Sequence, residues 1–584
     1  MAINNPYVPG DPFSYDLKWL VRKIREHQII LDGLDERIQN AIIAALENLD
    51  QLSPKYFESA ADLIGSDLKD KSIAYIEGFY ARGDGGANLY YVTTDYNDII
   101  GVNFYLTLDG PNRWALPIIV TPYVMPEMFG AYGDGTNDDS NAFEHAFKYD
   151  DVVLSKEYLI TEDLLLHSGL SVKALEHSII DVRHPSTGHK VFYGNGIENF
   201  SWTGGNFIGT GVASGATSCL FSFDDSTGIS ITNTSMENLQ FIWAIRMNNT
   251  KNARIEKNNV DHYSYGAFGS INGCKNIVFN ENIIKNLDIP GSGNGYPIMM
   301  SGGEEVVFNI CENIFATNNY IENTLVRWEG IDAHGGVNLF VTGNTIVGCL
   351  NGIAVFNEEA GVYNYKCENV TIANNICVGP DVSSSVGHGI IAGGKSFTIA
   401  DNIIRNFDAQ PLDGGIYGRY LSDAIISDNV IEMCGCAIIF SDNDTYSDGP
   451  TLIRGNIFNT CGRRSDTADS AAIKFTYVQK RTIIEKNIFE KSDGVLRAPS
   501  LVTASGYIKF TENVIAEPID DTRSGINELI SDTRTLAPTA SNTKMGCLGD
   551  TCKLWQPTTG QPIGWICTSA WDGSSVTWTA LPNL

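Results

Sequence analysis

The side chains best suited to catalysis lie in one short run, from Glu329 to His334, which holds two carboxyl groups and an imidazole. Paired carboxyl groups about 5–10 Å apart act as acid and base, or as acid and nucleophile, in glycoside hydrolysis. The apolar neighbour Trp328 is expected to raise the pKa of Glu329, which suits a general acid. Asp332 would stay ionised as the base or nucleophile. The run therefore predicts an acid–base site of the kind that cleaves glycosidic bonds.

Further acidic, imidazole, aromatic and basic side chains follow this run in the sequence. The predicted catalytic residues are Glu329, Asp332, Glu358 and His388. The predicted substrate-binding residues are His334, Phe356, Glu359, Tyr417 and Arg419. Aromatic rings such as Phe356 and Tyr417 offer the flat apolar surface on which a sugar can rest. No metal ion and no cofactor are part of the prediction.

All of these residues lie within a stretch from about Gly228 to Ala516, where the phrase apolar-x-apolar-x-x-Asn-x-apolar returns. Its asparagines are Asn258, Asn282, Asn319, Asn344, Asn375, Asn402, Asn429, Asn456, Asn487 and Asn513. Such a period, with alternating apolar residues in phase, marks a solenoid with strands in every turn. Each Asn suits a bend, where its amide can bond to the backbone or to the Asn one turn away. The fold class predicted is mainly β, a right-handed single-stranded parallel β-helix. A β-sandwich with chance spacing is the less favoured alternative.

The repeat can be used to align successive coils. A second phrase, Gly followed by Ile, precedes several Asn phrases, as at Gly330-Ile331 and Gly389-Ile390. If each Ile points inward, the flanking residues point outward and form a strip across neighbouring coils. The strip is expected to hold Glu329, Asp332, His334, Glu358 or Glu359, His388, Tyr417 and Arg419 over about 15 Å. The alternative is a solvated face that only keeps the solenoid soluble.

Net charge, the lack of long apolar runs and the spacing of the cysteines limit the kinds of partner that the chain is expected to bind. A net charge of -29 argues against nucleic acid as a ligand, because nothing offsets phosphate repulsion. The sequence shows no leader and no apolar run near the ~20 residues of a membrane helix, so neither standard secretion nor membrane insertion is expected. The twelve cysteines lack metal-site spacing, and most fall in apolar phrases, where a thiol acts as a small hydrophobe.

The rest of the chain suggests several domains, as its length of 584 residues requires. The predicted divisions are an N-terminal arm and helix (1–53), a small mixed β domain (54–124), the β-helix (125–520) and a small C-terminal β domain (521–584). From Ser14 an apolar heptad predicts a short coiled-coil stem, with a lone amphipathic helix as the alternative. In the small domain we expect a helix near Ala60–Leu68 and strands around Ser72–Phe79, Asn88–Thr93 and Asn103–Leu108.

The segment from Met128 to Ser140 reads Met-Phe-Gly-Ala-Tyr-Gly-Asp-Gly-Thr-Asn-Asp-Asp-Ser and precedes an expected helix at Asn141–Phe147. It resembles the start of the pectate-lyase-like β-helix superfamily found in many bacteriophage tailspikes and appendages. There Gly-Ala-x-Gly-Asp-Gly, two residues and Asp-Asp-Ser/Thr lead into a capping helix. Asp134, Asp138 and Asp139 are therefore interpreted as turn and helix-start carboxylates and not as catalytic groups.

The resemblance implies a homotrimer on a virion tail, made in the host cytoplasm without a signal peptide. Its N-terminal region would bind other virion tail proteins, and its β-helix would contact a host surface polysaccharide. Residues 73–92 and the Gly-Trp-rich ending from Gly546 also resemble parts of such spikes. The heptad and the aromatic ending would join three copies at both ends.

Three functions follow as alternatives, of which polysaccharide hydrolysis is the prediction. In a lyase, His388, Tyr417 or Arg419 would remove a proton instead. In a binding spike, the glycan would be held without turnover. The triplet Gly387-His388-Gly389 resembles that of polygalacturonase-like hydrolases, although their upstream Asp-Asp pair and downstream Arg-x-Lys are not matched here. A secreted pectin-degrading enzyme is a fourth, weaker alternative.

Overall fold

The computed structural model describes residues 54–183, 189–210, 219–239, 243–287, 295–302, 310–322, 329–356, 367–381, 386–408, 413–441, 449–461, 472–475, 482–490, 496–497, 508–515, 531–534, 551–554, 561–569 and 577–583. The chain divides into two compact units, residues 1–183 and 184–584. The predicted arm and coiled-coil helix (1–53) lie outside the described residues. Within the described ranges, no helix combines the length and apolarity needed to cross a membrane.

The first unit begins with a five-stranded sheet in the order β1-β2-β3-β5-β4. Its strands are β1 (Lys55–Phe57), β2 (Ile73–Ile76), β3 (Asn88–Thr93), β4 (Leu106–Thr107) and β5 (Trp114–Ile118), and a 3-10 helix η2 (Tyr96–Ile99) follows β3. Helix α4 (Ala60–Ile64) is shorter than predicted and begins with a capping box between Ser59 and Asp62. The predicted β3 is confirmed, but β5 is not anticipated, because Pro117 within it disfavours a strand.

The segment that follows in the first unit holds one α-helix, one 3-10 helix and short strands. The elements here are η3 (Pro126–Phe129), β6 (Asp134–Asp138), α5 (Ser140–Ala146), β7 (Asp151–Leu154), β8 (Glu157–Ile160), β9 (Leu164–Leu165), β10 (Ser171–Ala174) and β11 (Ile179–Val182). Strands β7 and β10 pair in parallel, as do β8 and β11. The predicted helix at Asn141–Phe147 is confirmed as α5, one residue earlier at each end.

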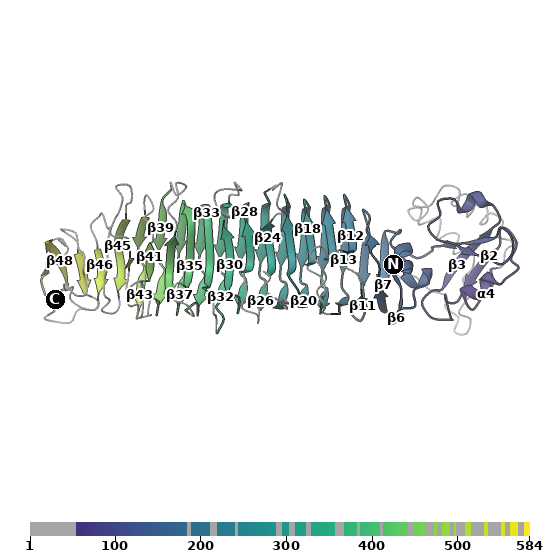
Figure 1. The fold of residues 1–584 in the computed structure, drawn as a ribbon, viewed down its shortest axis with the longest axis horizontal. Coiled ribbons are helices and arrows are strands. Elements are labelled where there is room, and N and C mark those ends of the chain that lie inside the picture. Colours follow the sequence, from purple (N-terminus) through teal and green to yellow (C-terminus); the bar gives the residue numbers. More distant parts are fainter. Residues whose placement is uncertain are drawn as a thin grey trace, which may run out of the picture. The chain divides into compact units, whose positions relative to one another are not determined.

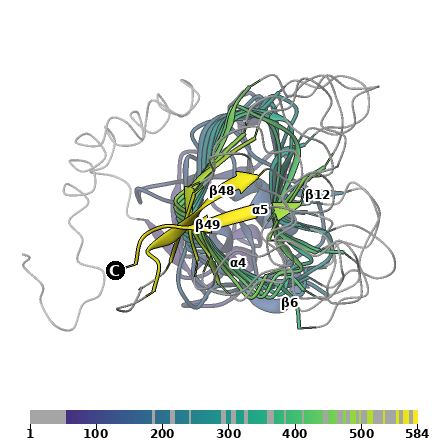
Figure 2. The same cartoon turned by 90° about the vertical axis from the view of Figure 1, so that its left-hand side faces the viewer.

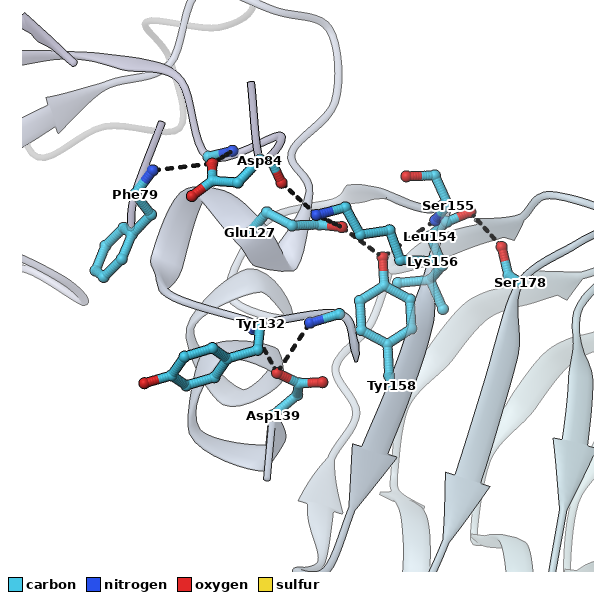
Figure 3. Close-up of polar contacts among 12 residues, drawn as sticks. Phe79, Asp84, Glu127, Tyr132, Asp139, Leu154, Ser155, Lys156, Tyr158 and Ser178 are labelled. Atoms are coloured by element: carbon cyan, nitrogen blue, oxygen red, sulfur yellow. Dashed lines mark hydrogen bonds and ion pairs between the residues drawn. The ribbon is translucent and has the colours of Figure 1, made fainter. Parts of the chain in front are cut away.

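The three aspartates of this segment bind backbone and hydroxyl groups. Asp134 accepts the backbone N–H groups of the two residues Thr136 and Asn137, each at 2.9 Å. Asp138 accepts the N–H of Ser140, the first residue of α5, at 3.0 Å. Asp139 accepts the N–H of Tyr132 at 2.7 Å (Figure 3). These contacts support their interpretation as turn and helix-start groups.

Two further polar side chains fasten the loops of the first unit (Figure 3). The Asp84 carboxylate accepts N–H groups from Phe79, Tyr80, Ala81 and Gly86, so the glycine-rich segment is a turn. Glu127 is buried, accepts the hydroxyl of Tyr158 at 3.0 Å and lies 3.8 Å from the ammonium of Lys156. Lys156 also donates to the carbonyl of Asp84.

The second unit is a parallel β-solenoid in which most strands pair with the third strand before and the third strand after them. The strands stack side by side along the coil axis (Figure 1), and the end-on view shows the coils superimposed (Figure 2). Three ladders of strands result, and β33 and β45 each bridge two of them.

Ladder 1 carries the predicted site. Its strands are β12 (Lys190–Asn195), β15 (Cys219–Asp224), β18 (Trp243–Asn248), β21 (Gly266–Ile271), β24 (Tyr296–Gly302), β27 (Glu329–His334), β30 (Asn351–Phe356), β33 (His388–Ala400), β35 (Gly414–Ser422), β38 (Cys436–Ser441), β41 (Ile473–Phe475) and β44 (Leu496–Arg497). Inward isoleucines stack along it, as Ile331, Ile353 and Ile390 do, each 0% exposed. Fully burying such a side chain contributes about 1.5–3 kcal/mol.

Ladders 2 and 3 complete each coil. Ladder 2 holds β13 (Glu198–Thr203), β16 (Thr227–Thr232), β19 (Lys251–Glu256), β22 (Lys275–Asn280), β25 (Glu312–Thr317), β28 (Gly336–Thr342), β31 (Cys367–Ala373), the second half of β33, β36 (Ala424–Ser427), β39 (Thr451–Arg454), β42 (Thr482–Glu485) and β45 (Ile508–Ile515). Ladder 3 holds β14 (Asn206–Ile208), β17 (Ser235–Glu237), β20 (Asn259–Tyr263), β23 (Ile283–Leu287), β26 (Tyr320–Glu322), β29 (Thr345–Val347), β32 (Ile376–Val378), β34 (Ile403–Arg405), β37 (Val430–Glu432), β40 (Ile457–Asn459) and β43 (Ile488–Glu490).

Among the described residues after Ile515, four more strands are found. They are β46 (Ser531–Arg534), β47 (Thr551–Leu554), β48 (Gly564–Ser569) and β49 (Thr577–Ala580). Strands β47, β48 and β49 pair in antiparallel fashion. The change from parallel to antiparallel pairing marks the end of the solenoid pattern.

The repeated asparagines form a continuous stack at the corner between ladders 2 and 3. From Asn258 to Asn513, each side-chain amide donates to the side-chain oxygen of the next Asn at 2.9–3.1 Å. Each amide also donates to a backbone carbonyl at 2.8–3.0 Å, as Asn402 does to Ile372. Both alternatives predicted for the Asn amide are therefore realised together.

The stack exists because the corner turns the chain sharply inside a closed coil. The residue before each Asn adopts a positive φ, as at Asp401 (56°) and Asp428 (59°), and glycine fills this position at Gly343 and Gly455. Asn, Asp and Gly tolerate this conformation best. The next residue faces the interior, where its buried backbone groups need partners that water cannot supply.

Removing one member of the stack should be costly. Asn402→Ala removes the acceptor for the backbone and side-chain N–H groups of Asn375 and the donor to Ile372 and Asn429. Each buried group left without a partner costs about 1–3 kcal/mol, so we expect a loss of roughly 2–4 kcal/mol in the free energy of unfolding. Denaturant titration measures it. The exposed Asn259→Ala should stay within about 0.5 kcal/mol of the parent chain, and equal losses would contradict the role of the stack.

Candidate active site

The predicted strip lies on four consecutive strands of ladder 1, namely β27, β30, β33 and β35. In their register Glu329 lies beside Asn351, and Asn351 beside His388. Asp332 lies in the neighbouring row, which leads through two apolar residues to Tyr417. The alignment of coils predicted from the Asn repeat is thus confirmed for these residues.

A local irregularity places Glu329 and Asp332 on the same face although they are three residues apart. Between them, Ile331 is fully buried, and a Cβ on Gly330 would lie 2.7 Å from the interior side chain of Ile346. Two successive residues therefore face inward, which breaks the strict alternation of a strand. Glycine is needed at 330 because any larger side chain would overlap the interior.

Glu329 is buried, with 4% of its surface exposed. Its Oε1 accepts a hydrogen bond from Nδ2 of Asn351 at 3.2 Å, and its Oε2 has no hydrogen-bond partner among the described residues. Burial, reinforced by the negative charge of Asp332, raises the pKa of Glu329 to about 8. The carboxyl group is therefore protonated at neutral pH, as a general acid must be.

Asp332 is completely buried and is paired with an imidazole. Its Oδ2 lies 3.1 Å from Nε2 of His334. The rings of Tyr296 and Phe356 stand edge-on to this imidazole, with centroids 6.4 and 5.4 Å away. Burial raises the pKa of the Tyr265 hydroxyl, and the charge of Asp332 adds to that rise. The carboxylate thus lies within a shell of aromatic rings.

A second cluster adjoins the first through Asn351, whose Oδ1 accepts the backbone N–H of His388 at 3.0 Å. The imidazole of His388 is stacked face to face on the ring of Tyr417, with centroids 4.5 Å apart. Burial lowers the pKa of His388 to about 4, so the ring is neutral at physiological pH. Asp413 holds the segment before it by accepting the N–H of Gly387 at 2.8 Å.

Arg419 on β35 contacts the part of the strip that lies on β30. Its guanidinium lies 5.7 Å from the ring centroid of Phe356, two coils away along ladder 1, in a cation–π contact. Phe356 also flanks His334. The two halves of the strip are therefore connected through one aromatic ring.

Three features of the prediction need correction or fall outside the described chain. The side chains predicted to point outward are buried, which also argues against the alternative of a solvated face: Asp332, Glu329 and His388 are 0%, 4% and 8% exposed. The raised pKa of Glu329 comes from burial and from Asp332, while Trp328 lies outside the described residues. The predicted residues Glu358 and Glu359 also lie outside them.

Four contributors have no role in the sequence-based prediction. Asn351 bonds to both Glu329 and His388. Tyr296 flanks His334 and packs against Tyr265, and Asp413 accepts the N–H of Gly387 just before His388. Asn351 occupies the same position before its Gly-Ile pair as Glu329 does before Gly330-Ile331, so the alignment of these phrases could have identified Asn351 as a neighbour of Glu329. Tyr265 precedes its strand, and no repeat phrase marks it. Among the described residues, no group of three or more His, Cys, Asp or Glu is arranged to hold a metal ion.

Comparison with known proteins bears on the fold. Residues 356–515 match the family described as "right handed beta helix region". No curated protein matches the chain. The match covers this part of the chain alone and agrees with the parallel β-solenoid that the structure shows.

Solved structures share this architecture at low identity. The surface adhesin PfbA of Streptococcus pneumoniae is 15% identical over 71% of this chain and 98% of its own, with a TM-score of 0.38. The A-module of the mannuronan C-5 epimerase AlgE6 of Azotobacter vinelandii is 13% identical over 68% and 100%, with a TM-score of 0.44. A tailspike mutant of E. coli bacteriophage HK620, solved with a pentasaccharide, is 13% identical over 68% and 75%, with a TM-score of 0.48. Similarity at this level does not transfer an activity.

Because the pKa of Glu329 is raised, the free energy of unfolding should decrease as the pH rises toward 8. The folded chain holds this proton up to about pH 8, whereas the carboxyl of an unfolded chain releases it near pH 4.5. The stability it contributes is complete below about pH 4.5 and is lost as pH rises through 8. Unfolding midpoints of the parent chain should therefore fall relative to those of Glu329→Gln between about pH 5 and 9. The control Glu312→Gln replaces a carboxyl on a side chain that is 43% exposed and should run parallel to the parent. A Glu329→Gln curve that is also parallel to the parent would contradict the burial argument.

His388 should act in the opposite direction. Its pKa is about 4 in the folded chain and near 6.5 when unfolded, so the folded chain resists protonation. The stability it contributes is complete above about pH 6.5 and is lost as pH falls toward 4. The thermal unfolding midpoint of the parent chain should therefore fall relative to that of His388→Gln as pH drops below 6.5. His177→Gln, at an exposed site, provides the control and should show no such divergence.

Proposed function

We propose that this chain binds a surface polysaccharide and hydrolyses its glycosidic bonds, with Glu329 and Asp332 as the acting carboxyl groups. One observation carries the proposal: a carboxyl kept protonated to about pH 8 stands beside a second carboxyl that is paired with an imidazole. A carboxyl held protonated by burial, next to a second carboxyl that is paired with an imidazole, is an arrangement from which an acid and its partner can be assigned.

The roles follow from the contacts. Glu329 has a free Oε2 and donates its proton to the leaving glycosidic oxygen. Asp332, oriented by His334, either activates water or attacks the sugar. Asn351 keeps the Glu329 carboxyl in place through its hydrogen bond to Oε1. A protonated general acid typically contributes 10²–10⁴-fold to the rate.

Sugar binding is assigned to the aromatic side of the strip. The stacked pair of His388 and Tyr417 and the ring of Phe356 offer apolar surfaces to the sugar, and Arg419 supplies a positive charge. His388 was predicted to be catalytic, but a ring that stays neutral down to about pH 4 is better suited to packing and hydrogen bonding. The predicted roles of Glu358 and Glu359 stay predictions.

The biological setting belongs to the same proposal. The segment from Met128 to Ser140 supports a homotrimeric virion tail appendage through its resemblance to tailspike β-helices. The N-terminal region would attach to other tail proteins, and the β-helix would meet the host glycan.

A glycan-binding spike without turnover is the second candidate, and the burial of the strip favours it. Asp332 is 0% exposed, and a carboxylate that substrate cannot reach performs no chemistry. In that case the Glu329–Asn351–His388 network would serve only to order the outer face of ladder 1.

Incubation with purified host capsule or wall glycan separates these candidates. If the chain is a hydrolase, Glu329→Gln and Asp332→Asn should each lower the release of new reducing ends by at least about 100-fold while glycan binding persists. Glu312→Gln, which removes an exposed carboxyl on ladder 2, serves as the matched control and should keep full activity. Unsaturated products absorbing in the ultraviolet would indicate a lyase, and binding with no product from the parent chain would favour the spike.

A further inference from the structure

The buried cysteines of the solenoid include two pairs that occupy matching positions in neighbouring coils. In the first pair, Cys274 and Cys311 directly precede two residues, Lys275 and Glu312, that are paired between β22 and β25. The backbone N–H of Glu312 also donates to the carbonyl of Cys274 at 3.0 Å. The two cysteines therefore lie one above the other at the corner between ladders 1 and 2.

The second pair lies at another corner, where the chain passes from ladder 3 to ladder 1. Cys434 and Cys461 each stand two residues after β37 and β40, which pair in register from Val430 and Ile457 onward. The thiol of Cys461 donates to the carbonyl of Ile431, in the coil of Cys434, at 3.4 Å. Among the described cysteines of the three ladders, no other two occupy matching positions in adjacent coils.

Cys349 and Cys377 provide a contrast. Both are buried and belong to neighbouring coils, but Cys377 is paired with Ile346, which comes three residues before Cys349. This offset takes their α-carbons beyond the limit of about 7 Å for a relaxed disulfide. At the matched pairs the α-carbons are separated by the coil spacing of about 4.8 Å, which lies within the range that disulfides use.

The thiols of the matched pairs are shielded from water and interact with each other. Cys274, Cys311 and Cys461 are each 0% exposed, and Cys434 is 2% exposed. The Cys274 thiol donates a hydrogen bond to the sulfur of Cys311, which lowers the pKa of Cys311. Burial raises the pKa of Cys274, so the first proton to leave this pair comes from Cys311. The resulting thiolate is the nucleophile of thiol–disulfide exchange.

We propose that Cys274–Cys311 and Cys434–Cys461 are two redox sites, each of which joins adjacent coils by a disulfide when a low-molecular-weight disulfide such as oxidised glutathione is present. At the first site, the Cys311 thiolate attacks one sulfur of oxidised glutathione and releases one glutathione thiolate. The Cys274 thiolate then attacks the Cys311 sulfur of this mixed disulfide and releases the second. Two protein thiols are oxidised, one glutathione disulfide is reduced to two thiols, and the released thiolates take up the two protons.

Each disulfide encloses one whole coil. The first closes the coil made of β22, β23 and β24, and the second closes the coil made of β38, β39 and β40. Such a cross-link removes conformations from the unfolded chain, and it stops neighbouring coils from separating one at a time. Disulfides persist in extracellular surroundings but not in a reducing cytoplasm. The chain can therefore fold with free thiols and have these two coils fixed afterwards.

Oxidation of the full chain with oxidised glutathione, followed by peptide mass spectrometry, tests this assignment. The chain is first reduced and then oxidised at a series of urea concentrations below its unfolding midpoint, where local opening admits the oxidant to buried thiols. Remaining thiols are blocked with a maleimide. The linked peptides of Cys274–Cys311 and Cys434–Cys461 should exceed every other cysteine pairing by at least about tenfold. In fully unfolded chains this preference should disappear, because pairing then follows distance along the chain.

Three variants provide the controls. Cys274→Ala should abolish the first linkage and leave the second unchanged. Cys377→Ala removes a buried thiol of the out-of-register pair and should change neither linkage. Cys436 lies two residues from Cys434, and Cys436→Ala should preserve the second linkage.

Several results would overturn the proposal. They are four thiols that react only in the unfolded chain, a Cys349–Cys377 linkage as abundant as the matched ones, or glutathione retained on Cys311 in the parent chain. If the proposal holds, oxidation should also shift the urea midpoint upward, and dithiothreitol should reverse that shift. No glycan takes part in these measurements, so their outcome is independent of the proposed hydrolysis.

Discussion

The corner between ladders 2 and 3 is the constraint on which the solenoid depends. There the chain turns from ladder 2 into ladder 3, and the peptide groups that face the interior have no access to water. Asparagine is short enough to fit and has both a donor and an acceptor, so one side chain per coil satisfies its own corner and the next. Because each amide bonds to the one above it, coils of unequal length are held in a single register, and the loops between Asn282 and Asn319 or between Asn344 and Asn375 can be long without disturbing the strands.

That register is what gives the candidate site its unusual electrostatics. Side chains far apart in the sequence are stacked on neighbouring strands. The acidic pair on β27 is buried, and the imidazole paired with Asp332 is flanked by the rings of Tyr296 and Phe356. A polar network in such surroundings is costly unless its members satisfy one another. Asn351 and His334 do this in part, while Oε2 of Glu329 is left without a partner among the described residues.

The ladders of the solenoid differ in what they bury and what they expose. Ladder 1 buries the titratable residues Glu329, Asp332 and His388, whereas ladders 2 and 3 expose aliphatic residues such as Ile403 and Ile425 beside the asparagine corner. Ion pairs such as Lys275–Glu312 and Lys285–Glu322 lie on these same two ladders.

The sequence by itself determined the coil, because an Asn at each corner and an isoleucine at each inward position leave a repeat that can be counted. It also determined which of Glu329, Asp332, His388 and Tyr417 would be neighbours, since register follows from that repeat. It could not show that Glu329, Asp332 and His388 are buried, that Asn351 bonds to Glu329 and His388, or that Tyr265 packs against Tyr296. Burial and aromatic contacts arise between coils joined by segments of irregular length, and only the tertiary structure brings those atoms together and sets the protonation of Glu329.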